Sequence, residues 1–589
     1  MVKAPALFIL GRSALPLALK LKDALRAEIH GPHGVPGPDH AYTKATTALQ
    51  DLFGDGRPIV ALCASGIVIR ALAPVLDDKR QEPPVLALAE DGSSVIPLLG
   101  GHHGANELAR KIASVTGGHA AITTASDLRL GAALDDPPQG WVLANPDDMK
   151  AFAARVLAGE SAGCNGRIPW LDLPAAPGAA LQVTATHADI AGSPSHLVYH
   201  PKVLTLGVGG ERGVSAEELL ALVEDTLARN RLSKHALAAV ASIDLKEDET
   251  AIHAVAQHLS LPLRVFTAAE LNAEAPKLKT PSELVMKEVG CPGVAEGAAL
   301  AAAGPDARLI VPKTKSARAT CAVALAPAPI LAPKGRARGR ISLVGLGPGD
   351  LSSRSPAASE ALRQATDWVG YDLYLELASD LKRLQKEHRF PLGAEEMRVR
   401  HAIALAKEGR EVALICSGDP GIYAMAALVY ELIDIEPQRI AVEVLPGISA
   451  FQAAAARAGA MIGHDFCCIS LSDLLTPWEV IEKRLQAAAQ GDFVTAFYNP
   501  RSLRRRGQLE QAIAILKPHR SADTPVIIAS NLGRAEEIVR IVTLGDFDPQ
   551  VVDMLTLVMV GSSQSKSFRR GDGRTYAYTP RGYARKRKT

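Results

Sequence analysis

One pattern recurs along most of the chain: a short run of aliphatic or β-branched residues is followed by a longer Ala/Leu-rich stretch of mixed polarity. Near the start, Ile59–Leu62 precedes Gly66–Leu76, and Val95–Leu99 precedes Ala105–Val115. The short runs have the length of buried strands, and the longer stretches have the spacing of amphipathic helices. Alternating strands and helices build sheets that are covered by helices. The pattern therefore predicts a multidomain α/β protein with mainly parallel sheets.

The chain of 589 residues is too long for a single hydrophobic core, and roughly three or four domains are expected. The clearest boundary is the segment APAPILAPKGRARG, whose Pro, Gly and Arg content favours an extended linker. In chain order we expect an N-terminal α/β domain, a connecting region, a second α/β domain, the linker, a large C-terminal domain and a basic tail, over residues 1–132, 133–200, 201–325, 326–339, 340–570 and 571–589.

Composition excludes several classes of protein. The 65 Lys and Arg residues nearly balance the 63 Asp and Glu residues, so no nucleic-acid-binding surface is predicted. No window reaches the roughly 18 uninterrupted apolar residues that cross a bilayer. Arg12 and Lys20 interrupt the apolar start, which argues against a signal peptide. The seven cysteines form no CxxC pair, which fits a reducing cytoplasm, so we expect a cytoplasmic protein without a membrane or nucleic-acid partner.

Four turns rich in Gly and Pro come directly after predicted strands of the C-terminal domain: Gly345–Asp350, Ser417–Tyr423, Leu445–Ala450 and Tyr498–Pro500. Glycine lets a backbone approach a ligand closely, and open α/β sheets bind ligands at the carboxyl ends of their strands. One such turn is often purely structural, but four in this order predict a ligand crevice. The first turn departs from the GxGxxG spacing, and Pro348 lacks an amide donor, which disfavours a nicotinamide or flavin site.

With these motifs, the segment from Ile341 to about Ser565 resembles the class III tetrapyrrole (corrin/porphyrin) methylases, whose hallmarks are GxGPGD, GDP and PGISA in this order. Within that family it is most similar to the ring-contracting precorrin-3B C17-methyltransferases, through Gly463–Trp478, Gly370–Tyr374 and Tyr498–Ser502. Ser355 stands where the family usually has Thr. The resemblance implies two α/β lobes around a cofactor crevice, S-adenosylmethionine as cofactor, a tetrapyrrole substrate and a homodimer.

The resemblance also implies which residues hold the cofactor. They come from the four turns and from two later strand ends: Gly347, Pro348, Gly349, Gly418, Asp419, Pro420, Ser449, Ala450, Tyr498, Asn531, Leu532 and Thr556. Methyl transfer to an electron-rich ring carbon depends mainly on positioning, which can supply on the order of 7–11 kcal/mol. A pattern of glycine turns without an evident nucleophile fits that chemistry.

Ring contraction is harder chemistry, for which a general acid or base is expected. The candidates are His464, Asp465, Asp473 and Tyr371, although for any one of them a role as a helix cap or loop residue is an equal alternative. Because the tetrapyrrole carries many carboxylates, an arginine clamp is also expected. Arg501 and Asn499, at the Tyr-Asn-Pro turn, are the candidates for substrate binding; the alternative for the arginine is a solvated surface position.

Two strand-to-helix turns of the first domain, Cys63–Arg70 and Pro97–Ala109, combine glycine with polar and cationic residues. Free amides at a helix N-terminus favour an anion such as a carboxylate, and histidine at such a turn can act as a general base near neutral pH. The pair His102 and His103 suggests a metal site, but no third ligand with a suitable spacing is apparent. No metal is therefore predicted.

These runs resemble the cobalt-precorrin-5A hydrolases, which open a δ-lactone and release a two-carbon fragment. The resemblance covers about residues 1–325 and continues in Gly207–Ser215, where Gly210 and Val214 replace a Cys and a Thr of the family's turn. For hydrolysis, His102 or His103 is the expected base, and Ser65, Asn106 and Lys313 are the expected substrate contacts. For each of them, a role as a loop or cap residue is an equal alternative. The alternative is a module that binds corrin intermediates without hydrolysing them.

The sequence thus predicts a bifunctional enzyme of corrin synthesis. One activity is C17 methylation with ring contraction of precorrin-3B or cobalt-factor III, and the other is lactone-opening hydrolysis of cobalt-precorrin-5A. A C11, uroporphyrinogen or diphthine-type methylase is disfavoured by Gly463–Trp478, and a nucleotide-dependent regulatory protein would not bind S-adenosylmethionine. Whether the substrate holds cobalt stays open, because the oxygen-dependent and oxygen-independent routes share this methylase family.

Overall fold

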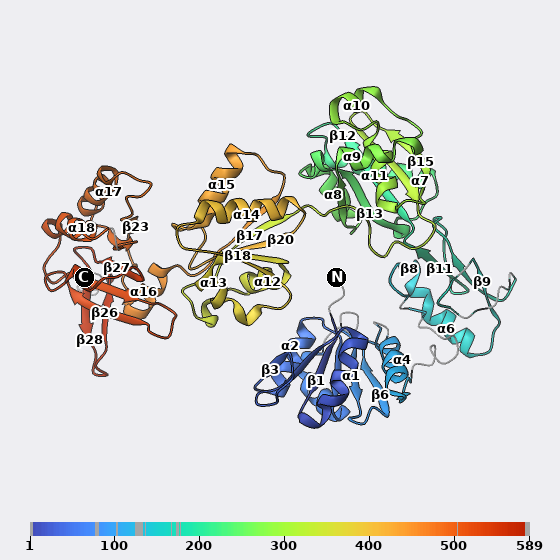
Figure 1. The fold of residues 1–589 in the computed structure, drawn as a ribbon, viewed down its shortest axis with the longest axis horizontal. Helices are drawn as coiled ribbons and strands as arrows, with labels where there is room; N and C mark the ends of the chain where they lie inside the picture. Colours follow the sequence, from blue (N-terminus) through green and yellow to red (C-terminus); the bar gives the residue numbers. More distant parts are fainter. Residues whose placement is uncertain are drawn as a thin grey trace. The chain divides into compact units, whose positions relative to one another are not determined.

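The chain forms two compact units in a computed structural model (Figure 1). The first unit comprises Met1–Ile243, Thr250–Pro262 and Phe266–Gly335, and the second comprises Asp244–Glu249, Leu263–Val265 and Arg336–Thr589, so the main division falls inside the predicted linker. The structure describes residues 4–76, 82–101, 104–123, 134–135, 137–166, 168–171, 173, 176, 178–502 and 505–583. In this part of the chain, every helix is too short or too polar to cross a lipid bilayer.

The first sheet has seven strands in the order β3-β2-β1-β4-β5-β6-β7. Its strands are β1 (Ala6–Ile9), β2 (Glu28–Pro32), β3 (His40–Tyr42), β4 (Ile59–Leu62), β5 (Val85–Leu88), β6 (Ser94–Leu99) and β7 (His119–Ala120). All neighbours are parallel except β5 and β6. Helices α1 (Leu15–Leu25) and α4 (Ala105–Thr116) cover one face, and α2 (Ala45–Gly54) and α3 (Ser65–Leu72) cover the other (Figure 1). Strand β1 is apolar throughout because both faces of the sheet are buried.

A second sheet lies within the segment that was expected to be a connecting region. Its order is β8-β11-β10-β9, formed by β8 (Trp141–Leu143), β9 (Ala162–Asn165), β10 (Leu181–Ala185) and β11 (His196–Pro201), with helix α6 (Met149–Leu157). Phe152 and Tyr199 are fully buried in its core, and the ring of Trp170 stands edge-on to Tyr199 at 5.1 Å. The short strands escaped detection because Pro and Gly interrupt their hydrophobic pattern.

The third sheet is mixed, with the order β14-β13-β12-β16-β15. Its strands are β12 (Leu204–Gly210), β13 (Leu237–Ile243), β14 (Leu263–Phe266), β15 (Arg308–Lys315) and β16 (Ala319–Leu325), and its helices are α7 (Ala216–Arg229), α8 (Thr250–His258), α9 (Ala268–Ala273), α10 (Glu283–Val289) and α11 (Val294–Ala303). Strand β16 runs antiparallel to both of its neighbours. Helix α11 lies so close to β12 that a Cβ on Gly207 would be 1.9 Å from the carbonyl oxygen of Ala295.

The second unit begins with a lobe whose sheet is entirely parallel, in the order β19-β18-β20-β17-β21. The strands are β17 (Arg340–Gly345), β18 (Asp367–Tyr371), β19 (Lys386–Phe390), β20 (Glu411–Cys416) and β21 (Ala441–Leu445). Helices α14 (Glu395–Lys407) and α15 (Met425–Ile435) cover one face, and α12 (Pro356–Gln364) and α13 (Asp372–Leu377) cover the other. This lobe has the predicted parallel α/β architecture.

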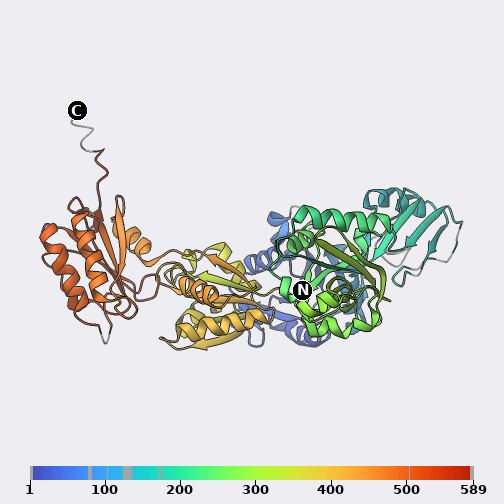
Figure 2. The ribbon, with the colours of Figure 1, turned by 90° about the horizontal axis from the view of Figure 1, so that it is seen from above.

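The second lobe departs from the expected parallel arrangement. Its sheet has the order β23-β24-β27-β25-β26, in which only β23 and β24 are parallel. The strands are β23 (Phe466–Ser470), β24 (Val494–Tyr498), β25 (Pro525–Ser530), β26 (Ile538–Thr543) and β27 (Thr556–Val560). Helices α17 (Trp478–Gln490) and α18 (Gln508–Leu516) pack on one face, and α16 (Ala450–Ala458) packs on the other (Figure 2). Short connections such as that between β25 and β26 favour antiparallel pairing.

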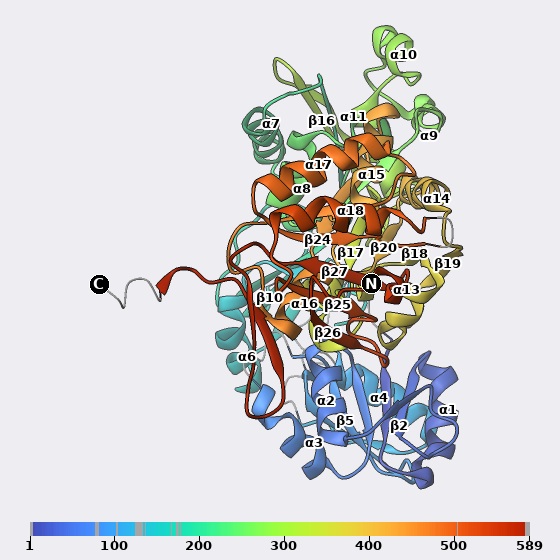
Figure 3. The same cartoon turned by 90° about the vertical axis from the view of Figure 1, so that its left-hand side faces the viewer.

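A small three-stranded sheet flanks this lobe, in the order β22-β29-β28 (Figure 3). It consists of β22 (Gly459–Ala460), β28 (Lys566–Arg569) and β29 (Thr575–Tyr578). Part of the segment expected to be a basic tail therefore forms a strand, and Ala577 within it is fully buried.

The contact between β12 and α11 predicts that Gly207→Ala destabilises the third sheet by about 1–3 kcal/mol, because the added methyl group forces backbone atoms apart. Hydrogen exchange of peptides that cover β12 should be faster in this variant. Gly297→Ala, in α11 itself, is the matched control. There the nearest atom would be 3.4 Å away, and alanine is the better helix former, so exchange should be unchanged or slower. Equal exchange in Gly207→Ala and the wild type would contradict the prediction.

Candidate functional site

The carboxyl ends of β20, β17 and β21 meet without room for side chains. A Cβ on Gly345 would lie 2.6 Å from the carbonyl oxygen of Gly418, and a Cβ on Gly447 would lie 2.1 Å from the same oxygen. The Gly418 amide donates to the Gly347 carbonyl at 2.7 Å, and the Gly347 amide donates back at 3.2 Å. Only glycine allows backbones to approach this closely, which explains the composition of the first three predicted turns.

Side chains fasten these turns to one another. One carboxylate oxygen of Asp419 accepts a hydrogen bond from the Gly421 amide at 2.8 Å, and the other accepts one from the Gly447 amide at 3.2 Å. Ser449 begins α16 with a capping box. Its hydroxyl oxygen lies 2.5 Å from the phenol oxygen of Tyr498, at the end of β24. The second, third and fourth predicted turns are thus connected by hydrogen bonds.

A cavity of about 380 Å³ is lined by these turns and by residues of the second lobe. Most of the residues expected to hold the cofactor line it: Pro348, Gly418, Asp419, Ser449, Ala450, Tyr498, Asn531, Leu532 and Thr556. The remaining three, Gly347, Gly349 and Pro420, belong to the same turns without lining the cavity. The structure therefore gathers residues from widely separated parts of the sequence around one space.

Three residues of the cavity wall have positive φ although none is glycine: Tyr423 at 52°, Asn499 at 49° and Asn531 at 51°. This backbone conformation is uncommon for residues with a side chain, and it persists where the surroundings impose it, often at functional sites. The Tyr423 hydroxyl donates to the Cys468 carbonyl at 2.8 Å, and the Asn499 amide donates to the Ser470 hydroxyl at 3.1 Å. These hydrogen bonds hold two of the three residues in place.

The polar groups with perturbed pKa values in the cavity wall are neutral near pH 7. Burial raises the pKa of Tyr374, Tyr423 and Tyr498 above the usual value, and it raises the pKa of Cys416 to about 12. The tyrosines therefore serve as hydrogen-bonding groups, and the thiol is not an ionised nucleophile. No described residue that lines the cavity is a histidine. The arrangement favours binding and positioning over covalent catalysis.

Residues 340–548 match the family model described as Tetrapyrrole (Corrin/Porphyrin) Methylases. A probable cobalt-factor III C(17)-methyltransferase of Salmonella typhimurium is 45% identical over 243 residues, which cover 41% of this chain and 99% of that protein. The chain belongs to the tetrapyrrole methylase family. A precorrin-3B C(17)-methyltransferase of a Sinorhizobium species is 40% identical over 252 residues, which cover 42% of this chain and 98% of that protein.

A crystal structure of the methyltransferase CobJ is also similar to this tetrapyrrole methylase, with 40% sequence identity and a TM-score of 0.39 over 41% of this chain and 100% of that chain. The first half matches two further family models. Residues 47–127 match Cobalamin synthesis G N-terminal, and residues 204–324 match Cobalamin synthesis G C-terminus. The protein is a fusion of these two domains with a tetrapyrrole methylase domain, and the β8-β11-β10-β9 sheet lies between the two matches in the sequence.

The four expected acid–base residues of the methylase domain occupy different places. Tyr371, at the end of β18, lines the cavity. His464 and Asp465 are exposed and lie 2.9 Å apart, between the imidazole Nδ1 and a carboxylate oxygen, just before β23. They precede β23, and the cavity is at the carboxyl ends of the strands, so the structure does not bring them to it. Asp473 accepts a hydrogen bond from Gln508 at 2.9 Å and does not line the cavity either.

The two expected substrate contacts of the methylase domain are also separated. Asn499 lines the cavity. The guanidinium of Arg501 donates to the Pro549 carbonyl at 2.8 Å and to the Gln550 side chain at 2.6 Å, and it does not line the cavity. Arg501 therefore connects the turn after β24 to the segment before β27.

In the first half, Ser65 and Asn106 lie in the first turns of α3 and α4, as the sequence predicts. His102 and His103 lie outside the described residues. The Lys313 ammonium donates to the Thr280 carbonyl at 3.1 Å, and its backbone amide donates to the carboxylate of Glu296 at 2.8 Å. Glu296 is 1% exposed and accepts hydrogen bonds from this strand and from the loop at Thr280, so it fastens the two together.

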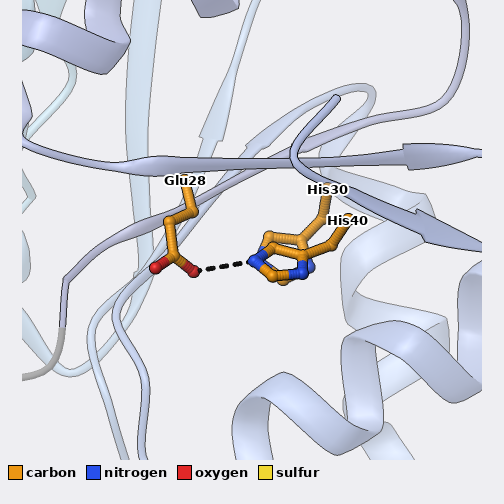
Figure 4. Close-up of side chains that lie close together, drawn as sticks. All are labelled: Glu28, His30 and His40. Atoms are coloured by element: carbon orange, nitrogen blue, oxygen red, sulfur yellow. Dashed lines mark hydrogen bonds and ion pairs between the residues drawn. The ribbon is translucent and has the colours of Figure 1, made fainter. Parts of the chain in front are cut away.

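A cluster that the sequence analysis did not single out lies on β2 and β3, where ligand-type atoms of Glu28, His30 and His40 are within 4.8 Å of one another (Figure 4). The Glu28 carboxylate accepts a hydrogen bond from Arg57 at 2.5 Å and lies 3.1 Å from the His40 Nε2. The imidazole rings of His30 and His40 stack with their centroids 4.6 Å apart and an interplanar angle of 24°. Because the guanidinium already neutralises the carboxylate, we interpret the cluster as an ion-pair network.

The sequence analysis missed several residues of the cavity wall. Tyr374 and Tyr423 were quoted within motifs but not as site residues, and Arg398 and Arg534 were not considered. Arg398 lies inside α14, next to the core residue Val399, and is itself buried. Its burial is visible only in the structure. Arg398 lies inside a helix, away from any glycine turn, whereas Arg534 directly follows Gly533 in the turn after β25, next to the expected Asn531 and Leu532.

The Glu28 cluster generates a pH prediction. Hydrogen bonding to His40 and the charge of Arg57 lower the pKa of Glu28 from 4.5 to about 2, so its contribution to stability is fully present above about pH 4.5 and is lost as the pH falls through about 2. The shift corresponds to roughly 3 kcal/mol. We expect the opening free energy of β1 and β2, measured by hydrogen exchange corrected for intrinsic rates, to decrease over this range.

Glu28→Gln should show a lower opening free energy at pH 7 and a weaker pH dependence. Glu107→Gln removes an exposed carboxylate in the same domain and should behave like the wild type. Identical pH profiles for Glu28→Gln and the wild type would show that the ion pair contributes nothing.

Proposed function

We propose that the protein is a bifunctional enzyme of cobalamin biosynthesis whose methylase domain methylates C17 of precorrin-3B or cobalt-factor III with ring contraction. The observation that carries this proposal is the 45% identity over 99% of a probable cobalt-factor III C(17)-methyltransferase. The precorrin-3B enzyme is covered over 98% of its length, so both substrates stay in the proposal.

S-adenosylmethionine is the proposed cofactor, and when bound it supplies an electrophilic methyl group on a sulfonium. The cavity of about 380 Å³ is within the usual range for small-molecule sites. Gly418 and Ala450 present backbone at its wall without bulky side chains, which suits a ligand that is held largely by main-chain groups. Asp419 has both oxygens engaged within the turns, so its role is to maintain the shape of the cavity.

The proposed chemistry depends on positioning. The ring carbon forms a bond to the methyl group while the carbon–sulfur bond breaks, and this displacement needs no ionised base in the site. The neutral tyrosines of the wall fit this requirement. Of the four acid–base candidates, Tyr371 is the one that lines the cavity, and we propose it as the proton donor or acceptor in ring contraction. Asn499 is proposed as a substrate contact.

For the first half, we propose hydrolysis of the δ-lactone of cobalt-precorrin-5A with release of a two-carbon fragment. The matches to both Cobalamin synthesis G models support this assignment. Ser65 and Asn106 stand at helix starts suited to a carboxylate, and His102 or His103 is the proposed base. The internal hydrogen bonds of Lys313 favour a structural role for that residue. The homodimer and the cytoplasmic location stay predictions.

Incubation with labelled S-adenosylmethionine and either precorrin-3B or cobalt-factor III tests the methylase proposal. Mass spectrometry should show one substrate with an added methyl group and a contracted ring. Asp419→Leu should abolish turnover because it breaks the hydrogen bonds between two turns, whereas Asp434→Leu, at an exposed position of α15, should not. Methylation of neither substrate would refute the proposed reaction, and undiminished transfer by Asp419→Leu would refute the cofactor placement.

The hydrolase proposal is tested with cobalt-precorrin-5A, from which the purified protein should release acetaldehyde. His102→Ala and His103→Ala should lower the rate on the order of 100-fold if the altered histidine is the general base. His258→Ala, on α8, is the matched control and should retain the rate. No acetaldehyde from a preparation that binds the substrate would leave a corrin-binding module as the function of this half.

A further inference from the structure

Two arginine side chains line the cavity of the methylase domain: Arg398 from α14 and Arg534 from the turn after β25. Arg398 is only 3% exposed. Its Nη2 donates to the Pro391 carbonyl at 3.2 Å, and its Nη1 lies 3.9 Å from the sulfur of Met425, which is a weak acceptor. Its Nε is buried without a hydrogen-bond partner. The guanidinium is thus largely removed from water with few compensating bonds.

Arg534 approaches the same space from the second lobe. A Cβ on Gly349 would lie 3.0 Å from its Cγ, so the glycine makes room for the arginine side chain. Its Nε is likewise buried without a partner. Both arginine charges act on Tyr374, where they oppose the rise in pKa that burial causes. All three side chains line the same cavity.

Among the described residues, neither arginine forms an ion pair with a carboxylate. The two acidic residues of the wall are engaged elsewhere: Glu395 accepts from the Gly393 amide at 3.2 Å, and Asp419 accepts from two backbone amides. Keeping a cation away from water without an anionic partner is unfavourable. An anionic ligand group would remove this cost, and the planar guanidinium fork matches a carboxylate best.

We propose that Arg398 and Arg534 form a subsite that binds a carboxylate of a ligand in the methylase reaction. The inference rests on the proposed function, which offers two sources of this group. One is the amino-acid carboxylate of the cofactor, and the other is a carboxylate side chain of the tetrapyrrole. Both arginines are positioning residues in this scheme, because they hold a ligand and do not enter the bond changes.

The test uses the full-length protein and two nucleoside ligands. S-adenosylhomocysteine carries the amino-acid carboxylate, and 5′-methylthioadenosine lacks it. If the cofactor is the source, Arg398→Gln and Arg534→Gln should each weaken S-adenosylhomocysteine binding, measured by calorimetry, by about 10- to 100-fold and leave 5′-methylthioadenosine unaffected. If the tetrapyrrole is the source, S-adenosylhomocysteine binding stays constant and the KM for the tetrapyrrole rises by a similar factor, with kcat changed less.

Arg400→Gln is the matched control, because it removes the same charge from α14 at an exposed position that is paired with Glu396 and Glu436. The affinity for S-adenosylhomocysteine and the KM for the tetrapyrrole should both stay at wild-type values in this variant. The melting temperature of ligand-free Arg398→Gln should be unchanged or higher, since an unpaired buried cation has been removed; a purely structural arginine would lower it. Arg398→Lys, which keeps the charge without the fork, should bind with intermediate strength.

Unchanged ligand affinity and unchanged KM in both glutamine variants would overturn the subsite. A wild-type protein that binds neither nucleoside would instead contradict the proposed function.

Discussion

The close packing of backbone around the carbonyl oxygen of Gly418 shapes the cavity of the methylase domain. This oxygen lies so near to Gly345 and Gly447 that neither position can carry a side chain. This contact brings the ends of three adjacent parallel strands together, and it places backbone instead of side chains at the wall of the cavity. The hydrogen bonds of Asp419 then keep two of the turns in register.

The residues that line the cavity fall into two groups: some maintain its shape, and others are proposed to bind ligands. Asp419 and the Ser449–Tyr498 pair use their polar atoms on one another or on backbone amides. Arg398 and Arg534 keep polar atoms without partners, which is the condition expected of groups that await a ligand. The half-buried Tyr374 and Tyr498 are neutral, so they can orient ligands without acting as ionised bases. This division suits methyl transfer, in which geometry matters more than proton transfer.

In the first half of the chain, two carboxylates have all their partners within the protein. Glu296 accepts several hydrogen bonds from a loop and a strand, and Glu28 is paired with Arg57 and lies within hydrogen-bond distance of His40. Both carboxylates are satisfied inside the protein, so both stabilise the fold. This is why Lys313, whose bonds belong to the Glu296 network, is better explained as a structural residue than as a ligand contact.

The sequence by itself determined the α/β class and the four turns of the methylase domain, and the family resemblance added nine cofactor positions that line the cavity. These features depend on local requirements, such as glycine at a close backbone contact, that a few adjacent residues encode. Only the tertiary structure revealed the antiparallel pairing of the second lobe, the extra sheet at 141–201 and the absence of His464 and Asp465 from the cavity wall. Only the tertiary structure shows that Arg398 and Arg534 line the same cavity. Such contacts join residues far apart in the chain, and no local pattern records them.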